Sequence, residues 1–194
     1  MSIRMATAAD IPQILEIYAP YVRNTAISFE YEVPTLEAFT QRFQSYTAQF
    51  PWLVWEEDGQ VLGYAYGSAP FERAAFGWCA EASIYLHPSI QGKGVGRKLY
   101  AALEAILALQ GYCKCYVLVT TANAASIAFH EAVGYHFTAQ MPNCGYKLGA
   151  WHGLVWLEKQ LNFAENPTQF PVSHHAVVDF DRKFQNILDT LSLS

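Results

Sequence analysis

Hydrophobic residues recur along this chain with two different periods. Runs of β-branched and aromatic residues, which favour extended structure, predict strands at residues 2–5, 52–55, 61–67, 78–86, 116–119, 137–141 and 154–159. Apolar residues spaced three and four apart predict helices between several of these runs. Strands interspersed with helices indicate an α/β domain with a mixed sheet, and the chain contains no internal repeat.

Caps and breakers mark where the expected helices begin and end. The first helix should begin near Asp10, and Pro20 should end or kink it, because proline lacks the N–H that a helix needs. A second helix should begin after Thr35, a residue type that caps helix N-termini. A third should span residues 97–109, with Gly111 as its C-cap.

The composition changes after Leu161. Residues 166–169 read Asn-Pro-Thr-Gln, which is typical of a linker. Beyond them, one helical face collects five apolar residues, Phe180, Phe184, Ile187, Leu188 and Leu191. We therefore expect a domain of residues 1–161 and an extension of residues 162–194. The apolar stripe should either fold back on its own domain or join a second subunit, and we favour a homodimer with the extension near or across the interface.

Composition and charge exclude several classes of protein. The chain has 194 residues, of which 52% are hydrophobic and 15% aromatic, which suits one well-packed domain and excludes a disordered protein. Its net charge of −5 argues against electrostatic binding of nucleic acid. Neither a basic and apolar leader nor a run of about 18 apolar residues is visible, so we expect a cytoplasmic protein that binds no membrane.

The four cysteines form neither a CxxC motif nor a paired framework. A zinc site built from Cys113, Cys115, His130 and His136 is the metal alternative. However, Cys113 and Cys115 have a single residue between them, whereas structural zinc pairs are usually separated by about two to four residues. We therefore expect reduced thiols and no metal.

The stretch from Gln91 to Arg97 carries the clearest chemical signal. It joins the strand-like residues 82–86 to a helical pattern, so a glycine-rich turn leads into a helix N-terminus. Backbone N–H groups at such a turn, together with the helix dipole, bind phosphate oxygens. The candidate residues are Gln91, Gly92, Lys93, Gly94, Val95, Gly96 and Arg97. The stretch lacks the Gly-Lys-Ser/Thr ending of a nucleotide P-loop and the Gly-x-Gly-x-x-Gly spacing of a dinucleotide fold.

The pattern Gln-x-x-Gly-x-Gly in this stretch resembles the pyrophosphate-binding signature of the GNAT N-acetyltransferase superfamily, which uses acetyl-CoA. Further segments resemble one branch, the phosphinothricin and methionine sulfoximine acetyltransferases: residues 28–30, 51–54, 63–66, 78–81, 84–86, 130–135 and 145–152. The resemblance implies the GNAT fold, a mixed and mostly antiparallel sheet flanked by helices, whose splayed central strands hold acetyl-CoA. It also implies a homodimer. The residues between Tyr66 and Phe76, above all residues 69–72, depart most from the phosphinothricin enzymes, so the resemblance does not by itself imply phosphinothricin as the acceptor.

Two residues are candidates for the proton transfers of amine acetylation. Glu81 lies in an apolar strand between two alanines, where desolvation would raise the pKa of its carboxyl toward that of a useful base. It also resembles the base glutamate of the family, although a strand-end glutamate can simply face solvent. By the same resemblance, His130 would protonate the leaving thiolate, although a lone helical histidine is more often structural.

The resemblance also implies contacts to both substrates. The backbones of Ile84, Tyr85 and Leu86 and the side chain of Asn123 would hold the pantetheine arm of acetyl-CoA. Asn123 would serve equally well as a plain N-cap. For the acceptor amine, the candidate residues are Phe71, Arg73, Ser83 and Lys147, of which an arginine suits an α-carboxylate.

These observations favour an acetyl-CoA-dependent N-acetyltransferase that acts on a small amino acid or analogue by direct attack, without an acetyl-enzyme. One alternative is an N-terminal acetyltransferase of proteins or peptides, which needs an open groove. The aromatic-rich residues 64–78 favour a closed pocket instead. The other is a non-catalytic module that binds acyl-CoA as a regulator, and the presence of both Glu81 and His130 argues against it.

Overall fold

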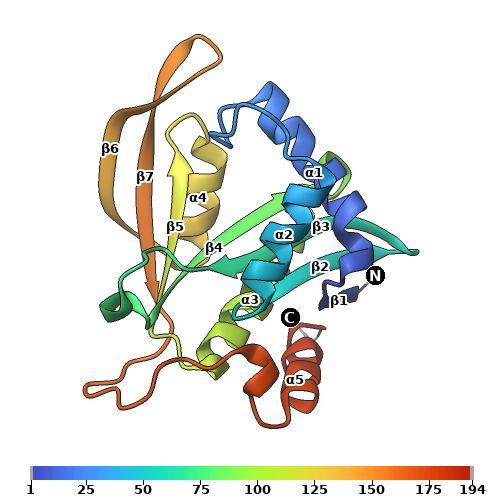
Figure 1. Ribbon diagram of the computed structural model, residues 1–194, viewed down its shortest axis with the longest axis vertical. Helices are drawn as coiled ribbons and strands as arrows, with labels where there is room; N and C mark the ends of the chain where they lie inside the picture. Colours follow the sequence, from blue (N-terminus) through green and yellow to red (C-terminus); the bar gives the residue numbers. More distant parts are fainter. Residues whose placement is uncertain (1, 193–194) are drawn as a thin grey trace.

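Seven strands form one mixed sheet in the order β1-β2-β3-β4-β5-β7-β6 (Figure 1). The computed structural model describes residues 2–192. The strands are β1 Ser2–Met5, β2 Trp52–Glu57, β3 Gln60–Ser68, β4 Cys79–Leu86, β5 Lys114–Thr120, β6 His136–Lys147 and β7 Ala150–Gln160. Of the neighbouring strands within the described range, only β4 and β5 run parallel. The expected mixed, mostly antiparallel sheet is confirmed.

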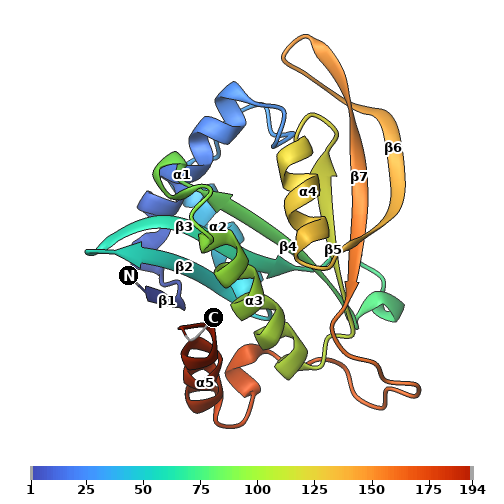
Figure 2. The same ribbon diagram turned by 180° about the vertical axis from the view of Figure 1, so that it is seen from behind.

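Helices cover both faces of this sheet. They are α1 Ile11–Asn24, α2 Leu36–Thr47, α3 Val95–Gln110, α4 Ala124–Ala132 and α5 Phe180–Ser192. Helices α1 and α2 lie on one face, and α3 and α4 lie on the other (Figures 1 and 2). Side chains of a strand alternate between the two faces. In β2, Trp52 and Val54 therefore join the core under α1 and α2, whereas Leu53 joins the core under α3.

Helix α1 does not end at Pro20. The helix continues to Asn24, although Pro20 has no N–H to donate to the carbonyl four residues earlier. The Pro20 ring is exposed on the outer side of the helix, so it disturbs no core contact. Burial of the opposite face, which includes Ile14 and Val22, holds the two halves of α1 in one helix.

The last two strands are longer than the sequence pattern indicates. β6 begins one residue before the expected segment and extends six residues beyond it, and β7 begins four residues earlier than expected. β6 is an edge strand, and most of its residues are exposed. An edge strand of this kind carries no alternation of apolar and polar residues by which its length could be read.

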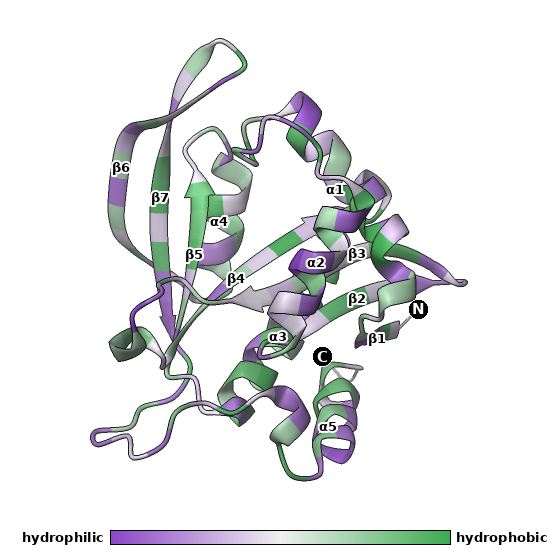
Figure 3. Ribbon diagram, in the orientation of Figure 1, coloured by the Kyte–Doolittle hydropathy of each residue, from purple (hydrophilic) through white to green (hydrophobic). Residues whose placement is uncertain are grey.

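The C-terminal extension folds back on its own domain. Helix α5 has an apolar and a polar side (Figure 3). Its five apolar residues pack against the core to which α3 contributes. The stripe is therefore covered within one chain, which is the first of the two expected arrangements. A homodimer with the extension near or across its interface stays a prediction.

Candidate functional site

Strands β4 and β5 separate from each other halfway along their length. The parallel register joins residues 79–81 to residues 114–116, and Glu81 opposite Tyr116 is the last pair. β4 continues to Leu86 and β5 continues to Thr120, but beyond the Glu81–Tyr116 pair the two strands no longer pair with each other. The facing edges beyond Glu81 thus keep backbone groups that can pair with an extended ligand in place of a strand.

The free backbone groups of β4 belong to alternate residues. The N–H of His87 donates to the carbonyl of Leu62 in β3 at 2.7 Å. In an antiparallel ladder, hydrogen-bonded residues alternate, so Tyr85 also bonds to β3. Ile84 then directs its N–H and C=O groups toward the gap, and Leu86 directs its N–H there, whereas the carbonyl of Leu86 already accepts from Tyr21 and Gln91. Of the three backbones expected to hold the cofactor, two face the cleft and that of Tyr85 does not.

The gap continues into a larger groove at the glycine turn. A cavity of about 70 Å³ lies between the two strands, and its lining includes Ser83, Ile84, Val119, Asn123 and His130. A groove of about 460 Å³ adjoins it, and its lining includes Leu86, Gly92, Gly94, Arg97, Asn123 and Phe129. The strand gap and the glycine turn therefore form one continuous surface, which suits a long ligand with an anionic end.

The glycine turn presents unpaired backbone donors. Gly92 and Gly94 have φ angles of 72° and 79°, a left-handed conformation that glycine adopts without strain, and no heavy atom lies within 4 Å of a Cβ built at either position. The first helical bond of α3 runs from the N–H of Lys98 to Gly94. Earlier N–H groups, those of residues 95–97, bond to nothing within residues 2–192. These free donors at a helix N-terminus fit a pyrophosphate.

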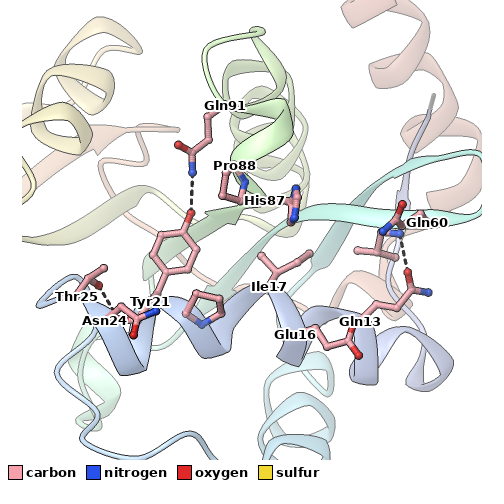
Figure 4. Close-up of a pocket in the computed structure, with 12 residues that line it drawn as sticks. Gln13, Glu16, Ile17, Tyr21, Asn24, Thr25, Gln60, His87, Pro88 and Gln91 are labelled. Carbon is pink, nitrogen blue, oxygen red and sulfur yellow. Dashed lines mark hydrogen bonds between the residues drawn. The ribbon is translucent and has the colours of Figure 1, made fainter.

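Gln91 lines this groove, and the Nε2 of its side chain already has two partners within the protein. Its Nε2 donates to the hydroxyl of Tyr21 at 3.0 Å and to the carbonyl of Leu86 at 3.2 Å. The Tyr21 hydroxyl also donates to Leu86, at 2.5 Å. Figure 4 shows Tyr21 pointing from α1 toward Gln91, beside a pocket of about 500 Å³. Gln91 thus ties the turn to the end of β4 and to α1.

Glu81 stands at the point where the strands separate. Its side chain is partly buried and makes no hydrogen bond or ion pair within the described part of the chain. Burial raises the pKa of the Glu81 carboxyl to about 7. A carboxyl with this pKa is half deprotonated near neutral pH, which suits a group that accepts a proton.

His130 is buried between α3 and α4, with an exposure of 3%. Its Nδ1 lies 2.7 Å from the carbonyl of Ser126, and its Nε2 lies 2.7 Å from the hydroxyl of Tyr100. Because a carbonyl only accepts, Nδ1 carries the proton and Nε2 accepts the proton of Tyr100. Burial lowers the pKa of His130 to about 4, so the ring is neutral at physiological pH.

Asn123 caps α4 and borders the cleft at the same time. Its Oδ1 accepts the N–H of Ser126 at 3.2 Å. Its Nδ2 has no partner within residues 2–192 and is the atom available to a ligand. The two roles considered for Asn123 therefore use different atoms of one side chain.

An aromatic wall adjoins Glu81 on the α1 side of the sheet. Phe71 stacks on Trp156 with ring centroids 5.6 Å apart, and Tyr116 packs edge-on against Trp156 at 6.0 Å. Glu81 is paired with Tyr116, and Tyr116 lies beside Trp156 across β5 and β7, so these side chains share a face. The sequence pattern indicated Phe71 but missed Tyr116 and Trp156, which look like ordinary strand residues.

The remaining acceptor candidates lie in different surroundings. Ser83 follows Glu81 on the same face of β4. Arg73 is exposed, and its side chain has no partner in the described range. Lys147 is buried, and its Nζ donates to the carbonyls of Val22 and Ser28 at 2.7 and 2.6 Å. The structure therefore places Lys147 where it fixes the chain after α1, and it does not bring this cation beside Arg73.

Within residues 2–192, no group of three or more His, Cys, Asp or Glu side chains is placed to hold a metal ion. No helix in the same range is both long and apolar enough to span a membrane.

Comparison with known proteins supports one family. The model of the acetyltransferase (GNAT) domain matches residues 3–156. An L-methionine sulfoximine/L-methionine sulfone acetyltransferase of Salmonella typhimurium is 37% identical over 169 residues, which cover 84% of this chain and 95% of the relative. An L-amino acid N-acyltransferase of Escherichia coli is 37% identical over 171 residues, which cover 86% of this chain and 98% of the relative.

The fold comparison agrees. A phosphinothricin acetyltransferase from Sinorhizobium meliloti, solved in complex with acetyl-CoA, superposes with a TM-score of 0.81 at 32% identity. The superposition covers 92% of this chain and 96% of that structure.

Proposed function

The chain belongs to the GNAT acetyltransferase family, and on that premise we propose that it transfers the acetyl group of acetyl-CoA to the α-amine of a small amino acid or amino-acid analogue. The amine attacks directly, without an acetyl-enzyme, and the reaction uses no metal. The observation that carries this proposal is the position of Glu81, a carboxyl with a raised pKa at the apex of a gap between two parallel strands.

The residues of the cleft fit acetyl-CoA. The unpaired N–H groups of residues 95–97, with the exposed side chains of Lys93 and Arg97 nearby, suit its pyrophosphate. The backbone of Ile84, the N–H of Leu86 and the Nδ2 of Asn123 suit the amides of its pantetheine arm. When bound there, acetyl-CoA supplies the activated acetyl group as a thioester.

Glu81 acts as the general base in this proposal. Its carboxylate removes a proton from the ammonium of the acceptor, directly or through a water molecule, and leaves the amine free to attack. No positive side chain neutralises Glu81 in the described structure, so its carboxylate keeps the basicity that burial confers. The free N–H of Ile84, which points into the gap, is placed to polarise the carbonyl of the acetyl group.

His130 serves as a positioning residue. A neutral ring could donate only from Nδ1, and the carbonyl of Ser126 already accepts that proton. The histidine instead fixes the hydroxyl of Tyr100, and both residues line the cavity between the strands. This role differs from direct protonation of the leaving thiolate, which would require a ring with a proton to spare.

The acceptor binds on the α1 side of Glu81. Phe71, Tyr116 and Trp156 form an apolar wall for its side chain, and Ser83 lies along the same face. Arg73, whose guanidinium is unpaired in the described structure, provides a cation for the α-carboxylate.

The protein forms a homodimer in the cytoplasm in this proposal. The β6–β7 hairpin projects beyond the rest of the sheet (Figure 1) and exposes large apolar side chains near its turn: Tyr146, Leu148 and Trp151. A contiguous apolar surface on an edge strand is typical of a subunit interface. Trp151→Ser combined with Leu148→Ser should yield monomers in light scattering, whereas Phe163→Ser, at another exposed phenylalanine, should not.

A thiol-release screen tests the function. Wild-type protein with acetyl-CoA is offered free amino acids, sulfoximines, sulfones and phosphinates, and short peptides in a parallel series. Release of CoA thiol with free amino acids or analogues supports the proposal. A preference for peptides would favour an N-terminal acetyltransferase, and tight acetyl-CoA binding without thiol release would favour a regulatory module.

A further inference from the structure

The segment that follows β7 contacts the loop that leads into β4. The ring of Phe170 stacks on Trp78 with centroids 4.3 Å apart and planes at 22°. The Nε1 of Trp78 donates to the carbonyl of Gln169 at 3.1 Å. Gly77 makes room for this contact, because a Cβ at that position would lie 2.8 Å from the Phe170 ring. Residues 169–170 are thus joined to residues 77–78 by ring stacking and a hydrogen bond, in a space that the glycine leaves open.

The tail is anchored immediately beyond Phe170. The N–H of Val172 donates to the carbonyl of Gln110 at 3.0 Å, and the Nε2 of Gln110 donates back to the carbonyl of Val172 at 2.8 Å. The Nε2 of Gln49 donates to the carbonyl of Pro171 at 3.2 Å. Gln110 is buried at the end of α3, so this anchor is firm. The Phe170 ring is therefore presented to the loop from a fixed point.

The same loop reaches the acceptor wall at its other end. Within residues 69–78, Phe71 stacks on Trp156 and lies 4.4 Å from Phe76. The loop is exposed over most of its length. The carbonyl of Trp78, at the end of the loop, accepts the N–H of Cys113 at 2.9 Å. The aromatic side chains of the loop pack against Tyr116 and Trp156 on the side of the acceptor and against Phe170 on the side of the tail.

We propose that residues 169–172, which we call the tail brace, fix the position of loop 69–78 and thereby set the affinity for the acceptor amine. This inference rests on the proposed function, because it places the acceptor beside Phe71. The brace lies outside the GNAT domain match, which ends at residue 156. The catalytic fold is thus complemented by a segment that acts on the acceptor side only, since the brace touches neither the glycine turn nor the gap between β4 and β5.

Phe170→Ala tests the brace by two independent measurements. Hydrogen exchange followed by mass spectrometry should show faster exchange in residues 69–78 and unchanged exchange in β2. With L-methionine sulfoximine, or the amine that the thiol-release screen selects, KM for the amine should rise about three- to tenfold, the range expected for the loss of one aromatic pair. The kcat and the KM for acetyl-CoA should stay within about twofold of wild type, because the cofactor cleft is untouched.

Two matched variants separate the brace from general loss of stability. Phe170→Tyr keeps the stacked ring and should behave as wild type. Phe163→Ala removes a phenylalanine from the same tail, and the Phe163 ring is 83% exposed, so this variant should also behave as wild type.

Each outcome decides the proposal. Unchanged exchange in residues 69–78 would show that Phe170 does not hold the loop. Faster exchange with an unchanged amine KM would show that the loop does not set acceptor affinity. Equal changes in both KM values would indicate a global structural effect and overturn the brace. A wild-type protein that acetylates no amine would overturn the proposed function and the predicted change in KM, while the exchange measurement would still decide the contact.

Discussion

The hydroxyl of Tyr100 donates to the Nε2 of His130 at 2.7 Å across the seam between α3 and α4. Both side chains are almost completely buried, with exposures of 1% and 3%. Since the Nδ1 of the same ring donates to the carbonyl of Ser126, this histidine has no lone pair or proton left over. The pair therefore fixes a neutral imidazole at the wall of the cofactor cleft.

This neutral histidine should make the protein sensitive to acid. The pKa of His130 is about 4 in the folded state, below the ordinary value of 6.5, so the unfolded chain takes up a proton that the folded protein excludes. The contribution is therefore complete above pH 6.5 and is lost progressively as the pH falls toward 4. It amounts to about 3 kcal/mol at most.

Urea unfolding at pH 7.0, 5.5 and 4.5 measures this dependence. His130→Phe should be less stable than wild type at pH 7, because Tyr100 loses its acceptor, but should lose less stability on acidification. His136→Asn, at an exposed position of β6, should keep the wild-type slope. Equal slopes in wild type and His130→Phe would contradict a buried neutral ring.

Glu81→Gln should abolish most turnover and leave acetyl-CoA binding intact. A general base contributes roughly 10²–10⁴-fold, so kcat/KM should fall by that factor. In wild type, kcat/KM should rise with pH through about 7, where the carboxyl loses its proton. Glu37→Gln, in the exposed first turn of α2, should retain both activity and pH profile. A loss below tenfold would reduce Glu81 to a positioning role.

Glu81→Gln should raise the stability of the protein at high pH, although it lowers activity. The folded pKa of Glu81 is raised above its ordinary value of 4.5, so its contribution is complete below pH 4.5 and is lost as the pH rises through 7. Glu81→Gln removes the burial of a charge and should be more stable than wild type at pH 8, by no more than about 3 kcal/mol. Thermal unfolding of both proteins at pH 5 and pH 8 checks this.

Gly94→Ala should weaken acetyl-CoA binding beyond its effect on stability. Gly94 and Gly59 share a left-handed conformation, with φ angles of 79° and 80°, and neither would place a Cβ within 4 Å of another heavy atom. Alanine at either position should therefore lower stability by a similar 1–2 kcal/mol, approximately. Only Gly94→Ala, in the glycine turn, should raise the KM for acetyl-CoA. An equal KM in Gly94→Ala and Gly59→Ala would remove the pyrophosphate from this turn.

Truncation after Asn162 should lower stability more than it alters cofactor affinity. The deletion exposes the apolar core residues against which α5 packs, while the glycine turn and the gap between β4 and β5 remain. Calorimetry should show a lower Tm, and isothermal titration should show acetyl-CoA affinity within a few-fold of wild type. An unchanged Tm would show that α5 is dispensable. Light scattering of the same protein would show whether the extension also contributes to assembly.

Features of the site that depend on residues close together in the chain were predictable from the sequence. A strand, a glycine turn and a helix N-terminus are consecutive in the chain, so the anion site around Gly94 follows from backbone conformation alone. The position of Glu81 in an apolar strand likewise indicated a carboxyl with a raised pKa, and burial has that effect in the structure. The apolar face of α5 was predicted from the sequence, but the spacing of its residues does not indicate which surface that face packs against.

Only the tertiary structure decided which groups meet from distant parts of the chain. The hydroxyl of Tyr100, thirty positions from His130, occupies the Nε2 of its ring, and the hydroxyl of Tyr21, seventy positions from Gln91, accepts from the side-chain amide of Gln91. Lys147 was a candidate for binding the acceptor, but in the structure its Nζ donates to the carbonyls of Val22 and Ser28. The physical reason is the same in each case. The sequence by itself determines the conformations and groups that a residue can adopt within its own segment, whereas hydrogen-bond partners and desolvation are supplied by segments that only folding brings together.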